Sequence, residues 1–328
     1  MRNIPSVRNS EIGLIKKLQD YAKFDDNSLD LEGFLNHYNL SVYDFYGRQG
    51  NRTFRRLLVK AGLATDFYAE NEVDFTKRLP SLFHLNSKKQ LEFYLRYIED
   101  RQILHEEERL MVNMLYYSFY LKDPFKEGFN SIEEGLANIL NIPEWKQEIF
   151  ELLTYNYNHL HHLEFAHDLN FPFPLGVHSE YTTAQIMAAF EYYHSEAAPT
   201  FQGGVKYFQD KNIDVFFITL NKSDKDFSPS TLYEDYAINE KLFHWQTQSR
   251  VRPTSDVAKR YINHRANNHQ IALFVREYRR ANGYTSPFIF LGTADYVSSS
   301  GDRPMDFIWK LREDLPPWLV VRANKSVL

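Results

Sequence analysis

The chain has one short run in which the side chains needed to read a nucleic acid stand close together. Residues 242–270, "LFHWQTQSRVRPTSDVAKRYINHRANNHQ", combine aromatic rings, amides and cations. Cations neutralise phosphates, amides hydrogen-bond base edges, and aromatic rings stack on bases. The run therefore predicts a nucleic-acid-binding surface. With the cations that follow it, the expected residues are Gln246, Gln248, Arg250, Arg252, Lys259, Arg260, Tyr261, Arg265, Arg276, Arg279, Arg280 and Arg303.

The first eight residues of this run have the alternation of a β-strand. Phe243, Trp245 and Thr247 would face one side of a sheet, and the residues between them the other. Alternating aromatic residues in a strand usually fill an interior, so we expect Trp245 in the core. Gln246 and Gln248 then point outward and become the better candidates for contact with a base.

Charge separates the C-terminal part of the chain from the rest. Residues 241–328 carry 14 Lys+Arg against 7 Asp+Glu, a net charge of +7, whereas residues 1–240 have a net charge of −12. A basic region attached to an acidic one is typical of proteins with a polyanionic partner, because phosphate contacts release counterions. Solvated arginines on a sheet surface are the alternative interpretation, since charge alone does not fix function.

A metal-dependent nuclease is a second hypothesis for the same region. Such enzymes hold a divalent ion with acids at the ends of strands, beside the scissile phosphate. The candidate catalytic residues are Asp214, Lys222, Asp224 and Asp226. Leu220 stands where the acid of an acid-x-lysine unit is required, and acidic clusters in loops are usually solvated, so the sequence favours a binding protein over an enzyme.

Basic residues also occur on one predicted helix within the acidic half. Arg52, Arg55, Arg56 and Lys60 line the helix from Thr53 to Ala61, and three of them recur at a spacing of four. This face could lie on a nucleic-acid backbone. The alternative is an amphipathic helix that packs through its apolar residues and exposes its charges to water.

Composition and missing motifs exclude several functions. The chain has no cysteine, which excludes disulfides, thiol catalysis and cysteine-ligated metals. It has no GxxxxGK[ST] phosphate loop and no HxKxxxxD unit, so it is neither an ATP-driven motor nor a phospholipase-D-like nuclease by itself. The histidines near residue 160 lack a defined third ligand, so we expect no metal and no cofactor. No apolar stretch has signal-peptide or membrane-spanning length, which indicates a cytoplasmic protein without a membrane partner.

Hydrophobic periodicity predicts an α+β protein, with an all-α N-terminal region followed by an antiparallel β-barrel-like domain. We expect a helical, helix-turn-helix-like part at residues 1–75, a helical scaffold at 76–198, and the β domain at 199–328. Asn282-Gly283 predicts a hairpin turn. The expected strands are 212–222, 242–249, 269–280, 286–300 and 305–311.

Several of these segments, in the same order, resemble a known family. "VFFITLNKSDKDFSPSTLYEDYAI", "FLGTADYVS" and "RPMDFIWKL" are similar to the C-terminal domain of unknown function in bacterial superfamily-two DEAD/DEAH-type helicases. The upstream helices around "LDLEGFLNHYNLSVYDFYGRQGNRTFRRLLVKAGL" resemble the helical linker after the motor of those proteins, many of which also carry a phospholipase-D-like nuclease. The resemblance implies an accessory region, fused to a motor or encoded alone, with a role in DNA defence or repair.

Together these observations predict an accessory DNA-binding module that recognises a structure or a modified base and directs a helicase or nuclease partner. The metal-dependent nuclease remains one alternative. A protein-interaction scaffold, whose acidic helical half docks a helicase, is the other.

Overall fold

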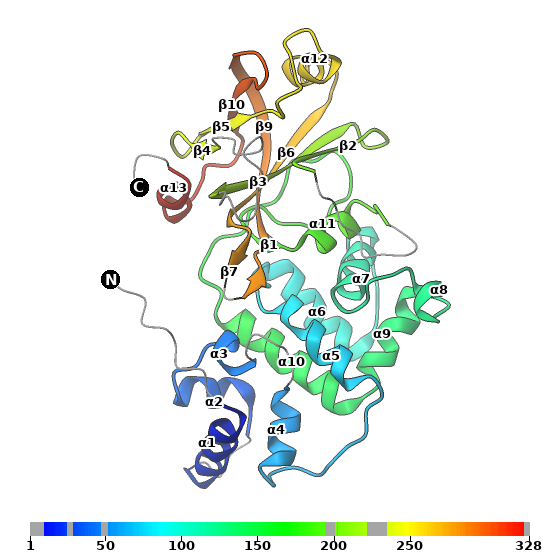
Figure 1. Ribbon diagram of the computed structural model, residues 1–328. Coiled ribbons are helices and arrows are strands. Elements are labelled where there is room, and N and C mark those ends of the chain that lie inside the picture. The colour runs from blue at the N-terminus through cyan, green and yellow to red at the C-terminus, as the bar shows by residue number, and fades with distance from the viewer. Residues whose placement is uncertain are drawn as a thin grey trace. The chain divides into compact units, whose positions relative to one another are not determined.

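The computed structural model describes residues 10–24, 29–46, 52–193, 201, 203–221, 235–281 and 283–324. The chain divides into two compact units. The helical unit comprises residues 1–161 and 187–199, and the sheet unit comprises residues 162–186 and 200–328 (Figure 1). The segment 162–186, which lies within the expected helical scaffold, thus belongs to the sheet unit.

Short helices with local start and stop signals make up the helical unit. Ser87 and Ser131 cap α6 and α9 by accepting the backbone N–H of the residue three positions on, and Pro143 occupies the first position of α10, where its missing N–H costs nothing. The elements are α1 (Glu11–Phe24), α2 (Leu31–His37), α3 (Val42–Tyr46), α4 (Phe54–Lys60), α5 (Glu72–Arg78), the 3-10 helix η1 (Leu79–Leu82), α6 (Lys88–Asp100), α7 (Glu106–Phe119), α8 (Pro124–Glu127), α9 (Ile132–Leu140) and α10 (Pro143–Asn158).

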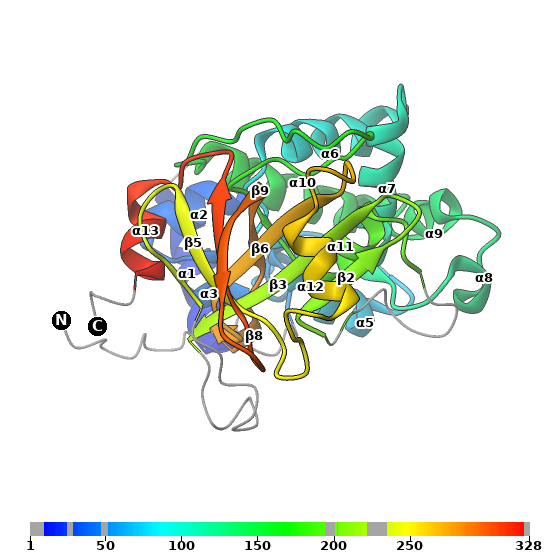
Figure 2. The same ribbon diagram turned by 90° about the horizontal axis from the view of Figure 1, so that it is seen from above.

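A mixed sheet forms the other unit. Its hydrogen-bonded order is β2-β3-β6-β9-β10-β5-β4, and β1 also pairs with β9. Figure 2 shows these strands side by side, with α12 on the β2–β3 side and α13 on the β5 side. The elements are β1 (Glu180–Tyr181), β2 (Val205–Phe208), β3 (Ile213–Asn221), β4 (Tyr236–Ala237), β5 (Leu242–Gln246), α12 (Asp256–Ile262), β6 (Gln270–Tyr278), β7 (Arg280–Ala281), β8 (Tyr284–Thr285), β9 (Phe288–Ser300), β10 (Asp306–Leu311) and α13 (Pro317–Ala323). The helix α11 (Thr183–Ala189) spans the boundary, because residues 187–189 belong to the helical unit.

The expected antiparallel barrel is wrong in two respects. β3 and β6 pair in parallel, from Ile213 opposite Gln270 to Asn221 opposite Tyr278. The sheet is also open, because the terminal strands of its order, β2 and β4, do not pair with each other in the described part of the chain. A parallel pair needs a long crossover connection, and here β4, β5 and α12 supply it. The five expected strands themselves are confirmed to within three residues at each end.

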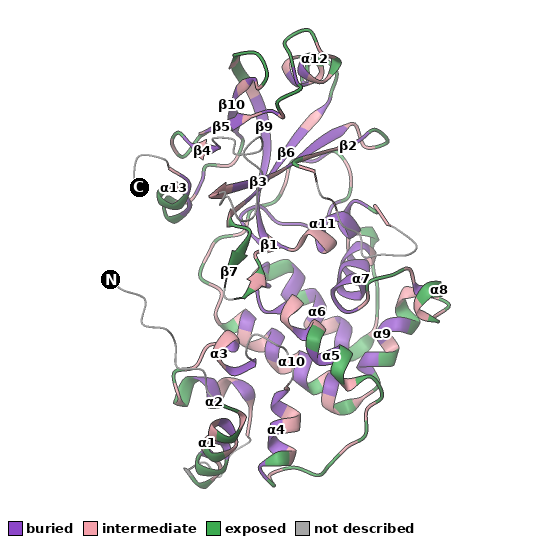
Figure 3. Cartoon of the chain, in the orientation of Figure 1, coloured by how far each residue is buried: buried purple, intermediate pink, exposed green. Residues whose placement is uncertain are grey.

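Successive residues of the central strands β3 and β6 are buried over most of their length, which explains why these strands are continuous apolar runs. On one face, Phe216, Leu273 and Trp309 belong to the main hydrophobic core, together with Ala258 of α12 and Leu319 of α13. Figure 3 shows the buried residues following the strands while the outer side of α12 is exposed.

The longest strand, β9, bends at a bulge. Ala272 and Phe274 of β6 pair with Thr293 and Phe290, so one extra residue lies on β9 between the two pairs. Gly292, in this stretch, has φ +83° and would place a Cβ 3.3 Å from the side chain of Val177. A residue with a side chain would be strained in this conformation, so glycine is required here.

The expected hairpin is confirmed. β7 and β8 pair with Arg280 opposite Thr285 and Ala281 opposite Tyr284, and Gly283 in the turn has φ +88°. Asn282 lies outside the described residues. The structure therefore places a small two-stranded ribbon between β6 and β9.

Candidate nucleic-acid interface

Strand β5 places the aromatic and amide side chains at the start of residues 242–270 on opposite faces of the sheet, as expected. Phe243 and Trp245 are buried in the core, and Trp245 stacks on Phe216 with ring centroids 4.1 Å apart. Gln246 faces the other way, but its Nε2 donates to Asp306 Oδ1 at 2.9 Å. The core prediction for Trp245 is thus confirmed, and the Gln246 amide is already engaged within the protein.

Tyr261 does not lie on a binding surface. Its side chain is buried and its ring packs edge-on against Phe216, Trp245 and Phe307. The sequence predicted it as a stacking platform because α12 was not recognised. This seven-residue helix has Ser255 as its N-cap and turns Tyr261 inward, so the ring serves the core.

Arg260 is also turned inward, toward a buried acid on β3. Its Nε lies 2.6 Å from Asp214 Oδ2, and its Nη2 lies 3.1 Å from Asp214 Oδ1. The guanidinium group stacks over the ring of Tyr207, 4.1 Å from the centroid. Arg260 thus fixes α12 to the sheet, and its charge is balanced inside the protein.

A buried histidine contacts the same aspartate. His269 Nε2 lies 2.8 Å from Asp214 Oδ2, and its Nδ1 lies 2.9 Å from Asn212 Oδ1. The Asn212 amide is oriented in turn because its Nδ2 donates to the backbone carbonyls of Asn267 and Asn268. The start of β3, the end of α12 and the start of β6 are therefore joined by one polar network.

The candidate nuclease residues are not brought together in the described structure. Asp214 is fully buried near the start of β3, and Asn221 ends that strand, about 23 Å further on at the usual rise per residue. Lys222, Asp224 and Asp226 lie outside the described residues. Within the described ranges, no cluster of three or more His, Asp or Glu side chains could hold a metal ion.

Three exposed cations remain on and before α12. Arg250, Arg252 and Lys259 have exposed side chains, and none of them has an acidic partner among the residues that the structure describes. The segment after the β9–β10 turn is hydrogen-bonded to the residue that precedes these cations in the chain. Thr247 N donates to Met305 O, and Met305 N donates to Thr247 Oγ1, both at 2.9 Å. This turn carries exposed Arg303, whose Nε lies 3.7 Å from Asp302 Oδ2.

The arginines after β6 lie at the opposite end of the sheet. β9 runs from Phe288, next to the β7–β8 ribbon, to Ser300, next to the turn that carries Arg303, a span of up to about 40 Å. Figure 1 shows β7 and α12 at these two ends. Arg279 and Arg280 are exposed at the ribbon, whereas Arg276 donates to Thr219 Oγ1 and stacks on Phe288. The predicted residues thus form two separate groups.

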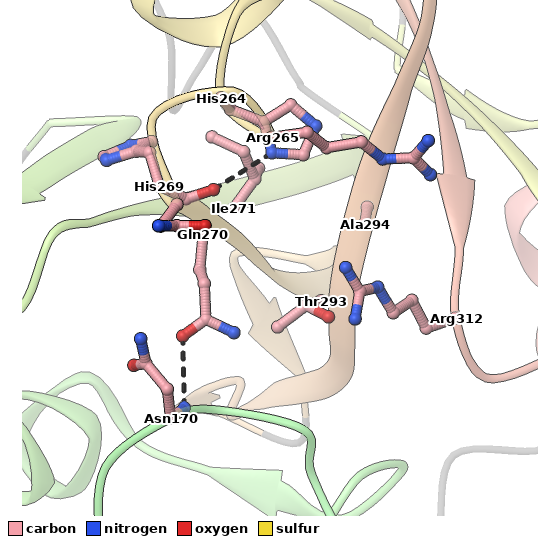
Figure 4. Close-up of a pocket in the computed structure, with 10 residues that line it drawn as sticks. Asn170, His264, Arg265, His269, Gln270, Ile271, Thr293, Ala294 and Arg312 are labelled. Carbon is pink, nitrogen blue, oxygen red and sulfur yellow. Dashed lines mark hydrogen bonds between the residues drawn. The ribbon is translucent and has the colours of Figure 1, made fainter.

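A pocket of about 520 Å³ lies in the sheet unit, where β6 begins (Figure 4). Asn268 and Gln270 bring amides to it, and Arg265 and Arg312 bring guanidinium groups. Asn170 closes one side, with its backbone N–H donating to Gln270 Oε1 at 3.2 Å. Of these residues only Arg265 was predicted from the sequence. Nothing in the sequence indicates that residue 170 lies beside a strand 100 positions later.

Carboxylates position the two arginines of this pocket. Asp295 Oδ2 lies 2.5 Å from Arg265 Nη2, and Asp295 Oδ1 lies 3.1 Å from Arg312 Nη2. Arg312 Nη1 also donates to Asp168 Oδ2 at 2.6 Å. Although partial burial of its carboxyl acts in the opposite direction, the two arginines lower the pKa of Asp295 to about 2. The pocket is therefore polar and close to electrically balanced.

His264 is fixed as a neutral ring at the back of the pocket. Its Nδ1 donates to the carbonyl of His269 at 3.0 Å, and its Nε2 accepts the backbone N–H of Tyr296 at 3.0 Å. Burial lowers its pKa, in agreement with this pattern. The ring holds the residues after α12 against β9, so it has a structural role.

The basic helix of the N-terminal half proves to be a packed amphipathic helix. Its apolar residues Phe54, Leu57, Leu58 and Ala61 are buried. Its cations are paired within the helical unit: Arg55 with Glu151, Arg56 with Asp66 and Glu72, and Lys60 with Glu11, while Arg52 is only partly exposed.

A buried carboxylate holds the start of the same helix. Glu148 Oε1 accepts the backbone N–H of Phe54 at 2.7 Å, and its Oε2 accepts that of Arg55 at 2.9 Å. Burial raises the pKa of Glu148. The side of α4 near Arg55 therefore faces the protein, so we do not include this helix in the candidate interface.

None of the helices in the described part of the chain combines the length and apolar character needed to cross a bilayer. A search of curated proteins gives no match. Among solved structures, the chain is similar to the DNA recognition domain of the cytosine modification-dependent restriction endonuclease LpnPI, at 13% identity and a TM-score of 0.29. The similarity covers 47% of this chain and 80% of that one.

One family model matches part of the chain. It describes a domain of unknown function, DUF3427, and covers residues 175–320, a range that contains β1 to β10. The exposed cations around α12 fall within it, as do all the pocket residues named above except Asp168 and Asn170. The part of the chain that carries most of the candidate interface is thus the part that matches this domain family.

Proposed function

We propose that the sheet unit binds DNA through the α12 surface, which we define as Arg250, Arg252, Lys259 and Arg303. The observation that carries the proposal is that the first three cations are exposed without an acidic partner in the described structure. Neighbouring Arg260, Arg265 and Arg312 are, by contrast, each paired with an aspartate. Unpaired cations at one end of a folded unit are free to neutralise phosphates.

The proposal assigns contact with a base to the pocket of Figure 4. Asn268 is exposed at its rim, and an asparagine side chain presents both a donor and an acceptor to a base edge. The segment that joins α12 to β6 contains Arg265 and Asn268, so the pocket is continuous in sequence with the α12 surface. Recognition of an unusual or modified base would take place here, whereas the phosphate contacts only position the DNA.

In this account the chain acts as an accessory to a helicase or nuclease in DNA defence or repair. The support is the resemblance of its segments to the region after the motor of such helicases, together with the lack of an ATPase motif in this sequence. The partner could be a separate protein or a motor fused to this region. Co-purification with a helicase that persists without any DNA binding would favour the scaffold hypothesis instead.

The test is a titration of the full chain against single-stranded, duplex and base-modified DNA at several salt concentrations. If three or four cations contact phosphates of duplex DNA, the logarithm of the association constant should fall with the logarithm of the salt concentration with a slope of about −3 to −4. An absence of binding to all three DNAs at low salt would contradict the proposal. Cleavage of DNA that requires a divalent metal would instead favour the nuclease.

A further inference from the structure

The helical unit contains a pocket that the proposed function does not use. It has a volume of about 740 Å³ and lies between α5, the end of α7, α9 and the start of α10. Phe75, Phe119 and Trp145 line it together with the less buried rings of Tyr120 and Phe129. Its size is within the range of sites that bind small molecules.

Stacked rings make the wall of this pocket rigid. Trp145 stacks on Phe75 with centroids 4.3 Å apart and an interplanar angle of 8°, and Phe75 stacks on Phe119 at 5.9 Å and 12°. Tyr120 is fixed as well, because its hydroxyl donates to the carbonyl of Gly135 at 3.0 Å. The wall can therefore offer a preformed aromatic surface to a ligand.

One buried donor in this wall has no partner. Trp145 is 2% exposed, and its Nε1–H makes no hydrogen bond to any residue that the structure describes. A buried donor without an acceptor is rare in folded proteins, and an oxygen of a bound ligand would satisfy it. The start of α10 adds positive potential, because its N-cap residue is Ile142, which has no side-chain acceptor.

Cations without acidic partners line the same pocket. Among the described residues, neither the partly buried guanidinium group of Arg78 nor the exposed ammonium group of Lys122 has an acidic partner. The two carboxylates of the lining are engaged: Asp74 lies 3.5 Å from Lys77 Nζ, and Glu127 Oε1 accepts the backbone N–H of Lys122 at 3.1 Å. Elsewhere in this unit Arg55, Arg56, Lys60, Arg96 and Arg109 are paired with acids, so Arg78 and Lys122 differ from them.

We propose that this pocket binds a small ligand in which a phosphate or carboxylate is joined to a planar ring. Arg78 and Lys122 hold the anionic group, the rings of Tyr120 and Phe129 contact the planar part, and Trp145 Nε1 donates to a ligand oxygen. The chemistry is shared by nucleoside monophosphates and aromatic carboxylates. The site lies entirely within the helical unit and does not depend on the DNA-binding proposal.

The experiment uses the full chain with adenosine 5′-monophosphate, benzoate and inorganic phosphate as probes. Calorimetry measures binding, and a proton–nitrogen spectrum follows the four indole N–H groups, with the Trp145 signal identified from Trp145→Phe. This variant keeps an aromatic ring beside Phe75 and removes only the donor and part of the ring. Arg78→Ala with Lys122→Ala removes the cations. The control is Lys88→Ala, which removes one exposed charge of the same unit outside the pocket.

We expect one of the two ring-bearing anions to bind with a dissociation constant of about 1–100 μM and to shift the Trp145 indole signal. Affinity should fall about tenfold or more in Arg78→Ala/Lys122→Ala, as charge-assisted hydrogen bonds are lost, and stay unchanged in Lys88→Ala. The probe that binds more tightly shows whether the anionic group of the ligand is a phosphate or a carboxylate. The proposal is overturned if neither binds, if inorganic phosphate binds equally tightly, or if the double variant binds as well as the wild type.

Discussion

Arg260 on α12 and Asp214 on β3 form a two-point ion pair, with Nε–Oδ2 and Nη2–Oδ1 distances of 2.6 and 3.1 Å. The carboxylate is fully buried, so both its oxygens depend on protein partners. The pair therefore attaches α12 to the sheet, and α12 presents Lys259 on its outer side.

Asp214→Asn should destabilise the sheet unit strongly. It leaves the Arg260 charge without its buried partner, and breaking such a pair typically costs about 3–5 kcal/mol. Urea unfolding followed by tryptophan fluorescence measures the change, since three of the four tryptophans lie in the sheet unit. Asp302→Asn, which removes only an exposed pair with Arg303, is the control and should cost less than about 1 kcal/mol. A stable Asp214→Asn protein that had lost a metal-dependent cleavage activity would support the nuclease hypothesis instead.

Asp295 should make the sheet unit sensitive to acid. Its pKa is lowered from 3.8 to about 2, so its contribution to stability is fully present above about pH 4 and is lost as the pH falls through 2. Because the side chain of Arg265 is exposed and that of Arg312 is about half exposed, we expect this contribution to be about 1–2 kcal/mol. Asp295→Asn should remove this contribution at neutral pH. Its free energy of unfolding should then change less than that of the wild type between about pH 4 and pH 2.

Glu180 on β1 should make the protein less stable as the pH rises, whereas Asp295 makes it less stable as the pH falls. Burial raises its pKa from 4.5 to about 7 although Arg322 lowers it. The folded protein therefore binds this proton more tightly than the unfolded chain, and the resulting stability is present below about pH 4.5 and lost as the pH rises through 7. Glu180→Gln should be more stable than the wild type by about 1–3 kcal/mol at about pH 8 and equally stable at about pH 4. If the wild type and Glu180→Gln had equal unfolding midpoints at both pH values, the pKa of Glu180 would not be raised by burial.

Sequence periodicity was sufficient to find five strands of the sheet but not their order, and it did not predict the short strands β1, β2 and β4. Runs such as residues 213–221 and 270–278 read as strands because β-branched and aromatic residues dominate them. Their parallel pairing depends on contacts between residues far apart in the chain, which a single sequence does not reveal. The seven-residue α12 was missed for a related reason: it is too short to be stable by itself and depends on the packing of Tyr261 and the ion pair of Arg260.

The site was harder to predict because the type of a residue does not indicate whether its side chain points into the protein or toward solvent. Arg252 and Arg260 look alike in the sequence, yet one is exposed and the other is paired with a buried aspartate. Arg280, equally basic, lies at the far end of β9 from Arg303. The pocket forms only because the loop around Asn170 contacts β6, and nothing in the local sequence indicates this contact.

Asn268→Gly should separate base recognition from phosphate binding. Asn268 has φ +49°, a conformation that glycine adopts easily, so the backbone is kept and only the amide is lost. If the pocket reads a base, the variant should lose about 1–3 kcal/mol of discrimination between plain and modified duplexes while the salt dependence stays the same. Unchanged discrimination, where the wild type shows some, would place base recognition elsewhere.

The most direct test of DNA binding compares the two ends of the sheet. Arg250→Ala/Arg252→Ala/Lys259→Ala and Arg279→Ala/Arg280→Ala both remove exposed cations of the sheet unit, and duplex affinity is measured for each across a salt series. We expect the triple variant to reduce the slope of the salt dependence by about 3 and the double variant to leave it unchanged. Equal losses in both variants, or an unaltered slope in the triple variant, would contradict the assignment of the interface to the α12 surface.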